Sequence, residues 1–316
     1  MDRIKVGVVG AGHLGTYHLQ KYHKLSTVEI LGVADVIEER AKDAGDRFSC
    51  RSFVDYRDLI GLVDVVSVAV PTAFHYEVAK DFLDAGVDVL LEKPIATTID
   101  EAEALIEIAR SKGLIFQIGF VERFNPAILA LEKVMSVPLF IEAHRLHPFL
   151  PRGTDVDVIL DLMIHDLDII IKFVQSPLEH VAAVGVNVIS DRVDIANARL
   201  TFKNGCVANI TASRVTGKTM QKVRFFCANG YHAVDYAKRE LISVSKKANG
   251  RSQSDIVPNK VDILNHDPLE EEIRAFLDAV TQRCACPVSG EDALPSLQAA
   301  VEIIDKMKTV KESFEL

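Results

Sequence analysis

The first 120 residues alternate strand-length apolar runs with helical patterns, and this alternation restricts the possible fold more than any other feature of the sequence. The runs are Ile4–Val9, Glu29–Ala34, Val63–Val70, Val87–Leu91 and Leu114–Gly119. They are apolar on both faces, as is typical of strands in a parallel sheet between two helical layers. The clearest helix spans Ile99–Lys112, which Thr98 or Asp100 can cap. This order predicts an α/β, doubly wound N-terminal domain.

The pattern changes after Phe120. A helix with a polar stripe is expected over Asp155–Val174, and it is followed by short strands joined by turn signals: Val181–Ser190, Ile195–Lys203, Cys206–Ser213, Lys222–Ala228 and Leu241–Ser245. Such strands predict a C-terminal α+β domain with a large, mostly antiparallel sheet. Helices are expected over Pro268–Arg283 and Ala293–Lys311, and a mobile loop over Lys246–Lys260.

These patterns divide the chain into three parts. Residues 1–120 form the first domain, residues 121–290 form the second, and residues 291–316 form a C-terminal helix that packs back on the first domain. The total length of 316 residues suits about two domains with large cores.

Charge and composition exclude several classes of protein. A formal net charge of -9 argues against a sequence-independent nucleic-acid binder, which needs a basic face. No apolar run approaches the roughly 20 residues of a membrane-spanning helix, and the N-terminus lacks the features of a signal peptide. The five cysteines show no repeated metal or disulfide spacing, so a reducing cytoplasm and no metal are expected.

A glycine-rich motif directly follows the first predicted strand and opens a helix. In Gly10-Ala11-Gly12-His13-Leu14-Gly15, the first glycine permits a tight turn, the second permits a pyrophosphate to approach, and the third permits close helix packing. The N–H groups of the helix N-terminus then face the phosphates. A purely structural glycine turn is the alternative.

Asp35 ends the second predicted strand, 20 residues beyond Gly15. An acidic residue at this place accepts hydrogen bonds from a ribose diol and repels a 2′-phosphate, which favours NAD over NADP. Arg40, one turn further on, weakens that preference. A helix cap is the alternative role for Asp35.

Lys93 follows the strand Val87–Leu91 in the sequence Glu92-Lys93-Pro94. Ligands of open α/β sheets bind at the carboxyl ends of strands, and Pro94 restricts Lys93 to an extended backbone. A surface lysine is the alternative.

The Asp155–Val174 helix carries a second candidate group. At about 100° per residue, one narrow stripe contains Asp157, Asp161, His165, Asp168 and Lys172. A histidine with carboxylates one turn away has a stabilised imidazolium and a fixed orientation, as a proton-transferring group needs. A solvated helix face is the alternative.

Taken together, these motifs resemble those of the glucose–fructose oxidoreductase/inositol dehydrogenase/MocA family. The resemblance rests on Gly10–Gly15, Glu92-Lys93-Pro94, Gly119-Phe120, Arg123-Phe124-Asn125-Pro126 and the Asp161/His165 pair, which occur in the family order. One departure is Met163, where the family often has glycine.

The resemblance implies a Rossmann domain that binds NAD and a sheet domain that binds substrate and mediates homodimers or homotetramers. It implies that Lys93, Asp161 and His165 surround the reacting carbon of a sugar-like alcohol. It also implies cofactor contacts for Pro71, Thr72, His75, Glu92 and Lys93 and a substrate contact for Arg123. His75 could equally be the first residue of the next helix.

The segment Glu142–Thr154 is rich in basic side chains for an acidic protein. Arg145 and Arg152 could clamp a diphosphate, although ordinary ion pairing would also explain them. The segment resembles that of family members that oxidise C3 of a UDP-N-acetylhexosamine to a keto sugar for lipid A assembly. The alternatives are a dehydrogenase of a free sugar, sugar acid or cyclitol, and a non-catalytic dinucleotide sensor.

Overall fold

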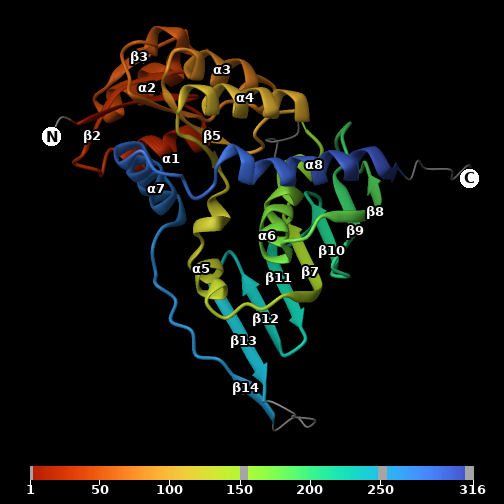
Figure 1. Ribbon diagram of the computed structural model, residues 1–316. Coiled ribbons are helices and arrows are strands. Elements are labelled where there is room, and N and C mark those ends of the chain that lie inside the picture. Colours follow the sequence, from red (N-terminus) through yellow and green to blue (C-terminus); the bar gives the residue numbers. More distant parts are fainter. Residues whose placement is uncertain (1–2, 150–155, 248–254, 310–316) are drawn as a thin grey trace, which may run out of the picture. The chain divides into compact units, whose positions relative to one another are not determined.

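The computed structural model describes residues 3–149, 156–247 and 255–309. Figure 1 shows the path of the chain. Its contacts divide it into two compact units, each built from two segments. Unit 1 comprises Met1–Val121 and Asp267–Leu294, and unit 2 comprises Glu122–His266 and Pro295–Leu316.

Unit 1 contains a six-stranded parallel sheet in the order β3-β2-β1-β4-β5-β6. The strands are β1 Ile4–Val9, β2 Val28–Ala34, β3 Arg51–Phe53, β4 Val65–Val68, β5 Asp88–Glu92 and β6 Phe116–Gly119. The strand order reverses between β1 and β4, so the carboxyl ends of these strands form the switch point at which doubly wound sheets bind dinucleotides. The predicted α/β class is confirmed.

The described part of unit 1 contains five α-helices, of which α4 and α7 begin at a capping side chain. They are α1 His13–Tyr22, α2 Glu38–Phe48, α3 His75–Asp84, α4 Ile99–Lys112 and α7 Pro268–Gln282, with short 3-10 turns η1 Tyr56–Leu59 and η2 Thr72–Phe74. Helix α4 has the predicted bounds: Thr98 and Glu101 form a capping box, and Gly113 ends the helix with a φ of 65°.

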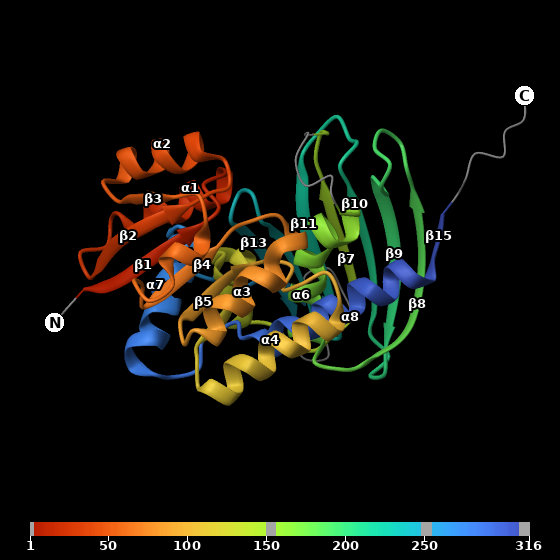
Figure 2. The ribbon, with the colours of Figure 1, turned by 90° about the horizontal axis from the view of Figure 1, so that it is seen from above.

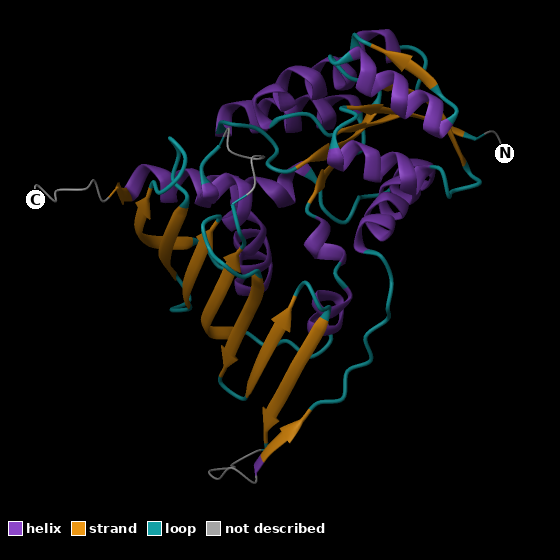
Figure 3. Cartoon of the chain, turned by 180° about the vertical axis from the view of Figure 1, so that it is seen from behind, coloured by secondary structure: helices purple, strands orange, loops and turns teal. Residues whose placement is uncertain are grey.

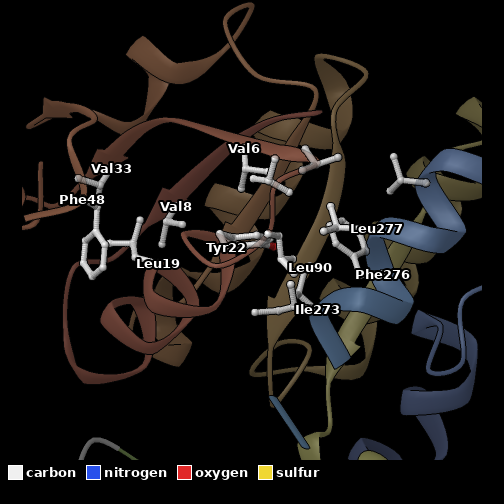
Figure 4. Close-up of a cluster of buried hydrophobic side chains, with 14 of the residues drawn as sticks. Val6, Val8, Leu19, Tyr22, Val33, Phe48, Leu90, Ile273, Phe276 and Leu277 are labelled. Atoms are coloured by element: carbon white, nitrogen blue, oxygen red, sulfur yellow. The ribbon is translucent and has the colours of Figure 1, made fainter. Parts of the chain in front are cut away.

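Helix α7 belongs to unit 1, which differs from the predicted division of the chain. Its apolar side joins the core of the parallel sheet, as Figure 4 shows for Ile273, Phe276 and Leu277 beside Leu90 and Tyr22. Because this face is covered by the sheet core, residues 267–294 cluster with the first domain. The contacts within the chain assign Pro295–Leu316 to unit 2.

Unit 2 contains a nine-stranded sheet in the order β14-β13-β12-β11-β7-β10-β9-β8-β15. The strands are β7 Pro138–Leu146, β8 Leu178–Val186, β9 Ile195–Phe202, β10 Val207–Ser213, β11 Met220–Cys227, β12 Gly230–Asp235, β13 Glu240–Lys246, β14 Ile256–Pro258 and β15 Met307–Thr309. Neighbouring strands are antiparallel except for β7 with β10 and β8 with β15. Figure 3 shows these strands side by side, and the predicted mostly antiparallel sheet is confirmed.

The remaining elements of unit 2 are α5 Pro126–Glu132, a π-turn η4 Ile159–Met163 and α6 Ile164–Val174. Two further elements, η3 Val121–Phe124 and α8 Gly290–Lys306, begin in unit 1 and end in unit 2. Helix α6 lies against the sheet beside β7 (Figure 2). The expected mobile loop over Lys246–Lys260 is partly wrong, because Ile256–Pro258 pairs with β13 as strand β14. Residues 248–254 of that segment lie outside the described residues.

Candidate active site

The three glycines of the first loop have different surroundings. Gly10 has a φ of +94°, and a Cβ there would meet the carbonyl oxygen of Ala69. A Cβ on Gly15 would meet the carbonyl oxygen of Gly10, so both positions exclude a side chain. A Cβ on Gly12 would have nothing within 4 Å. This open space above Gly12, at the N-terminus of α1, fits the pyrophosphate of a dinucleotide.

Asp35 holds this loop from the end of β2. One carboxylate oxygen accepts a hydrogen bond from the main-chain N–H of Ala11 at 2.8 Å, and the other accepts from the N–H of Ile37 at 2.9 Å. The second contact is the cap-like role that the sequence left open. Since a carboxylate has about four acceptor sites, it retains capacity for a ribose diol. His13 and Leu14 are exposed at the start of α1.

The loop that contains Lys93 follows β5. Its neighbour Glu92 is expected to contact the cofactor. In the structure its carboxylate lies in the interior of unit 1, where Oε1 is 3.0 Å from Nε2 of the buried His18. The Lys93–Pro94 peptide bond is cis. Lys93 itself is half-buried.

His75 was also expected to contact the cofactor, and the structure corrects this. It is the first residue of α3 and is 1% exposed, with both ring nitrogens within hydrogen-bond distance of main-chain carbonyls. The alternative interpretation as a helix residue therefore holds. Pro71 and Thr72, at the start of η2, are exposed and half-buried, so they stay accessible to a ligand.

The middle of the predicted polar stripe keeps two accessible residues. Within residues 158–170, only Asp161 and His165 keep intermediate solvent exposure, and the other residues of this range are buried. Asp161 lies in the π-turn, a helix irregularity that is frequent at functional sites, and His165 lies four residues later in α6. The predicted pair is thus presented to solvent from an otherwise buried element. Met163, the departure from the family pattern, is fully buried.

The other carboxylates of the predicted stripe have structural partners. Oδ1 of Asp157 accepts from the main-chain N–H of Val193 at 3.0 Å. Asp168 is fully buried and receives two hydrogen bonds from Arg123, at 2.6 and 2.7 Å. Asp157 leaves the stripe because it lies before Val158, the first helical residue. Arg123, from which a substrate contact is expected, thus forms a bidentate pair with Asp168, and its substrate contact stays a prediction.

Arg145 is part of a buried ion cluster. It lies on the inward side of β7 and is 3% exposed. Its guanidinium donates to both carboxylate oxygens of Asp166, at 2.9 and 3.2 Å, and to Glu122 at 3.1 Å. It also stacks over the ring of Tyr236. These contacts use three of the five N–H donors of a buried guanidinium, so ion pairing explains the placement of Arg145, and its substrate contact stays a prediction. Arg152 lies outside the described residues.

The sequence interpretation missed the buried polar groups of unit 1. His18 and Glu272 are both fully buried, on α1 and α7. Burial, and then the charge of Glu92, raises the pKa of Glu272 well above 4.5. A polar residue on the apolar side of a helix was the available signal, because such a position needs a buried partner.

Residues 3–149, 156–247 and 255–309 contain no helix long and apolar enough to cross a membrane. In the same ranges, no three His, Cys, Asp or Glu side chains are grouped as a metal site.

Comparison with known proteins extends over both units. Residues 4–120 match the model of an oxidoreductase family with an NAD-binding Rossmann fold, and residues 138–232 match the C-terminal domain model of the GFO/IDH/MocA proteins.

Two similar proteins cover nearly the whole chain. A UDP-N-acetylglucosamine 3-dehydrogenase from Acidithiobacillus ferrooxidans is 37% identical over 96% of this chain and 97% of its own length. Its solved structure has a TM-score of 0.89 at 36% identity, over 97% of this chain and 98% of that chain. A myo-inositol 2-dehydrogenase from Thermotoga maritima is 25% identical over 98% of both chains.

Proposed function

This chain belongs to the glucose–fructose oxidoreductase/inositol dehydrogenase/MocA family of oxidoreductases, and we propose that it oxidises C3 of a UDP-N-acetylhexosamine with NAD. It is a sugar oxidoreductase with an NAD-binding Rossmann domain. The observation that carries the proposal is the exposure of Asp161 and His165 alone within the buried residues 158–170. A helix that served only packing would not present an acid and an imidazole one turn apart.

The roles of the side chains follow from the chemistry of alcohol oxidation. His165 takes the hydroxyl proton, and Asp161 steadies the imidazolium that forms. The ammonium of Lys93 stabilises the negative charge that develops on the oxygen. Bound NAD supplies the hydride acceptor. The open space above Gly12 and the carboxylate of Asp35 support the choice of a dinucleotide with a free ribose diol.

The nucleotide-sugar substrate is proposed from the relative that is 37% identical over nearly the full length. A keto sugar formed at C3 is the kind of product that later amination in lipid A assembly consumes. A second candidate, oxidation of a free sugar or cyclitol, is favoured by one observation: Arg145, one of the two expected diphosphate ligands, forms buried ion pairs with Asp166 and Glu122.

A substrate panel separates these candidates. The purified protein with NAD is mixed in turn with UDP-N-acetylglucosamine, free N-acetylglucosamine and myo-inositol, while absorbance at about 340 nm records reduced cofactor. Turnover of the UDP-sugar alone supports the first candidate. Turnover of the free compounds alone establishes the second, and no turnover with any of them contradicts both.

We also propose that two copies associate through the open face of the nine-stranded sheet. On this face Phe226 lies between Phe140 and Tyr231, with ring centroids 5.6 and 5.1 Å away, and Ile242 is 62% exposed. Exposed aromatic and aliphatic side chains on one sheet face are typical of homo-oligomer interfaces. Light scattering should give at least a dimer mass, and Ile242→Glu should lower it; a monomeric wild type contradicts this proposal.

The cytoplasm is the compartment that fits these proposals. All five cysteines are free thiols, as a reducing compartment maintains them.

A further inference from the structure

The residues on either side of Lys93 are each held by a buried histidine. Glu92 contacts His18 of α1, and Pro94 contacts His75 of α3. All of these residues belong to unit 1. The two histidines come from different helices and lie 57 positions apart in the chain, so their convergence on one short segment is a product of the fold.

His18 holds the residue before Lys93. It is fully buried, and its Nε2 lies 3.0 Å from Oε1 of Glu92. Its Nδ1 has no hydrogen-bond partner among the described residues. The ring therefore makes its directional contact through Nε2, and this contact joins the helix after the glycine loop to the end of β5.

His75 holds the residue after Lys93. Its Nδ1 lies 2.7 Å from the carbonyl oxygen of Pro94, and its Nε2 lies 2.9 Å from that of Val70. Burial lowers the pKa of His75, which favours a neutral ring with one N–H. The contact with Pro94 is the shorter and the more deeply buried of the two, so the hydrogen is assigned to Nδ1.

We infer that His18 and His75 are positioning residues that fix the backbone on both sides of Lys93 and thereby aim its ammonium group. The inference rests on the proposed function, in which Lys93 stabilises the developing oxyanion. A lysine side chain has four rotatable bonds. The position of its ammonium group therefore depends on the direction in which the backbone holds the first of them. A misplacement of about 1 Å is enough to lower turnover by about 10²-fold.

The two contacts use different ring nitrogens, and this permits a crossed test. A glutamine amide reaches the place of Nε2, and an asparagine amide reaches the place of Nδ1. His18→Gln and His75→Asn therefore keep the contacts with Glu92 and Pro94, whereas His18→Asn and His75→Gln lose them. The four variants are compared for turnover, NAD affinity, unfolding temperature and crystal structure, with Lys93→Met as the reference for loss of the lysine.

The inference predicts a crossed result. His18→Gln and His75→Asn should keep turnover within about threefold of wild type, while His18→Asn and His75→Gln should lose about tenfold or more, with NAD affinity alike in all four. Crystal structures should show the Lys93 main chain displaced only in the latter two. Equal turnover within each pair, a parallel loss of NAD affinity, or an unmoved Lys93 overturns the inference.

Failure of the proposed function gives a different pattern. If wild type oxidises no sugar, or if Lys93→Met retains turnover, the proposed chemistry is wrong. The crystal structures of the four variants still decide whether the two histidines place Lys93.

Discussion

The carboxylate of Asp35 accepts a hydrogen bond from the main-chain N–H of Ala11 at 2.8 Å, which joins the end of β2 to the glycine loop. One side chain thus orders the loop and places a negative charge beside it. This arrangement favours a cofactor with a free ribose diol over one with a 2′-phosphate.

Replacing Asp35 should therefore change cofactor preference. Asp35→Ser is expected to narrow the ratio of NAD to NADP affinity by about tenfold, since one charge-assisted contact of about 1.4 kcal/mol is removed. Titration of both cofactors measures the ratio. Asp55→Ser is the control, because Asp55 also accepts from a main-chain N–H, that of Arg57, but caps η1. A wild type that prefers NADP contradicts the assignment of Asp35.

Arg145 should affect stability and not substrate affinity. Arg145→Met leaves the buried carboxylate of Asp166 and the half-buried carboxylate of Glu122 without their cation, which should destabilise the fold by about 3–5 kcal/mol. Arg110→Met is the matched control: its pair with Glu107 lies on the exposed surface of α4 and is worth about 0–1 kcal/mol. Denaturant unfolding measures both. A stable Arg145→Met protein with weakened UDP-sugar binding would instead support the predicted role of Arg145 as a diphosphate ligand.

Glu272 should make stability fall as the pH rises. Its pKa is raised in the folded protein, so between its unfolded value near 4.5 and the raised value the folded state holds a proton that the unfolded state releases. Glu272→Gln removes this dependence, and its stability relative to wild type should grow by up to about 1.4 kcal/mol per pH unit above pH 5. Unfolding at pH 5 and pH 8 tests this.

Glu270 is the control for this experiment, two positions earlier on the same helix. A hydrogen bond from Arg274 lowers the pKa of Glu270, so Glu270→Gln should cost a little stability at neutral pH and not add any. A difference between Glu272→Gln and wild type that does not change with pH would show that Glu272 is ionised in the folded protein.

Variants of Lys93, Asp161 and His165 should differ in how much turnover they lose, according to the role of each side chain. His165→Ala and Lys93→Met should each lower turnover by about 10²-fold or more with NAD affinity close to wild type, because both act on the reacting alcohol. Asp161→Asn should lose less than His165→Ala, since it removes only the charge that steadies the imidazolium. Turnover in wild type should rise with pH through one ionisation that disappears in His165→Ala. Full turnover by His165→Ala would show that His165 is not the base, and Lys93 would then be the candidate for that role.

Local signals in the sequence were sufficient for five of the six strands of unit 1 and for helix α4, but not for β3 or for the place of α7. The glycine spacing, the cap at Thr98 and the apolar strands depend on neighbouring residues, and all reappear in the structure at nearly the predicted positions. Strand β7 was missed because its inward positions include Arg145, which breaks the apolar pattern of a buried strand. The partners that make this burial possible, Glu122 and Asp166, lie 23 and 21 positions away.

Long-range contacts also explain the misassigned site residues. His75 follows the predicted strand Val63–Val70, at a place where a cofactor ligand is expected. Its hydrogen-bond partner Pro94, however, belongs to the loop after β5. The pair Asp161 and His165 was predictable because helical spacing alone places both on one side of the chain. The burial of Asp168 was not, because it depends on Arg123, 45 positions away.

The most direct test of the account is the transfer of hydrogen from C3 of the sugar. UDP-N-acetylglucosamine that carries deuterium at C3 is incubated with the protein and NAD, and both products are analysed by mass spectrometry. The account predicts a 3-keto UDP-sugar without the deuterium and a reduced nicotinamide that has gained it. A reduced nicotinamide without deuterium, or no reduction at all with this substrate, would contradict the account.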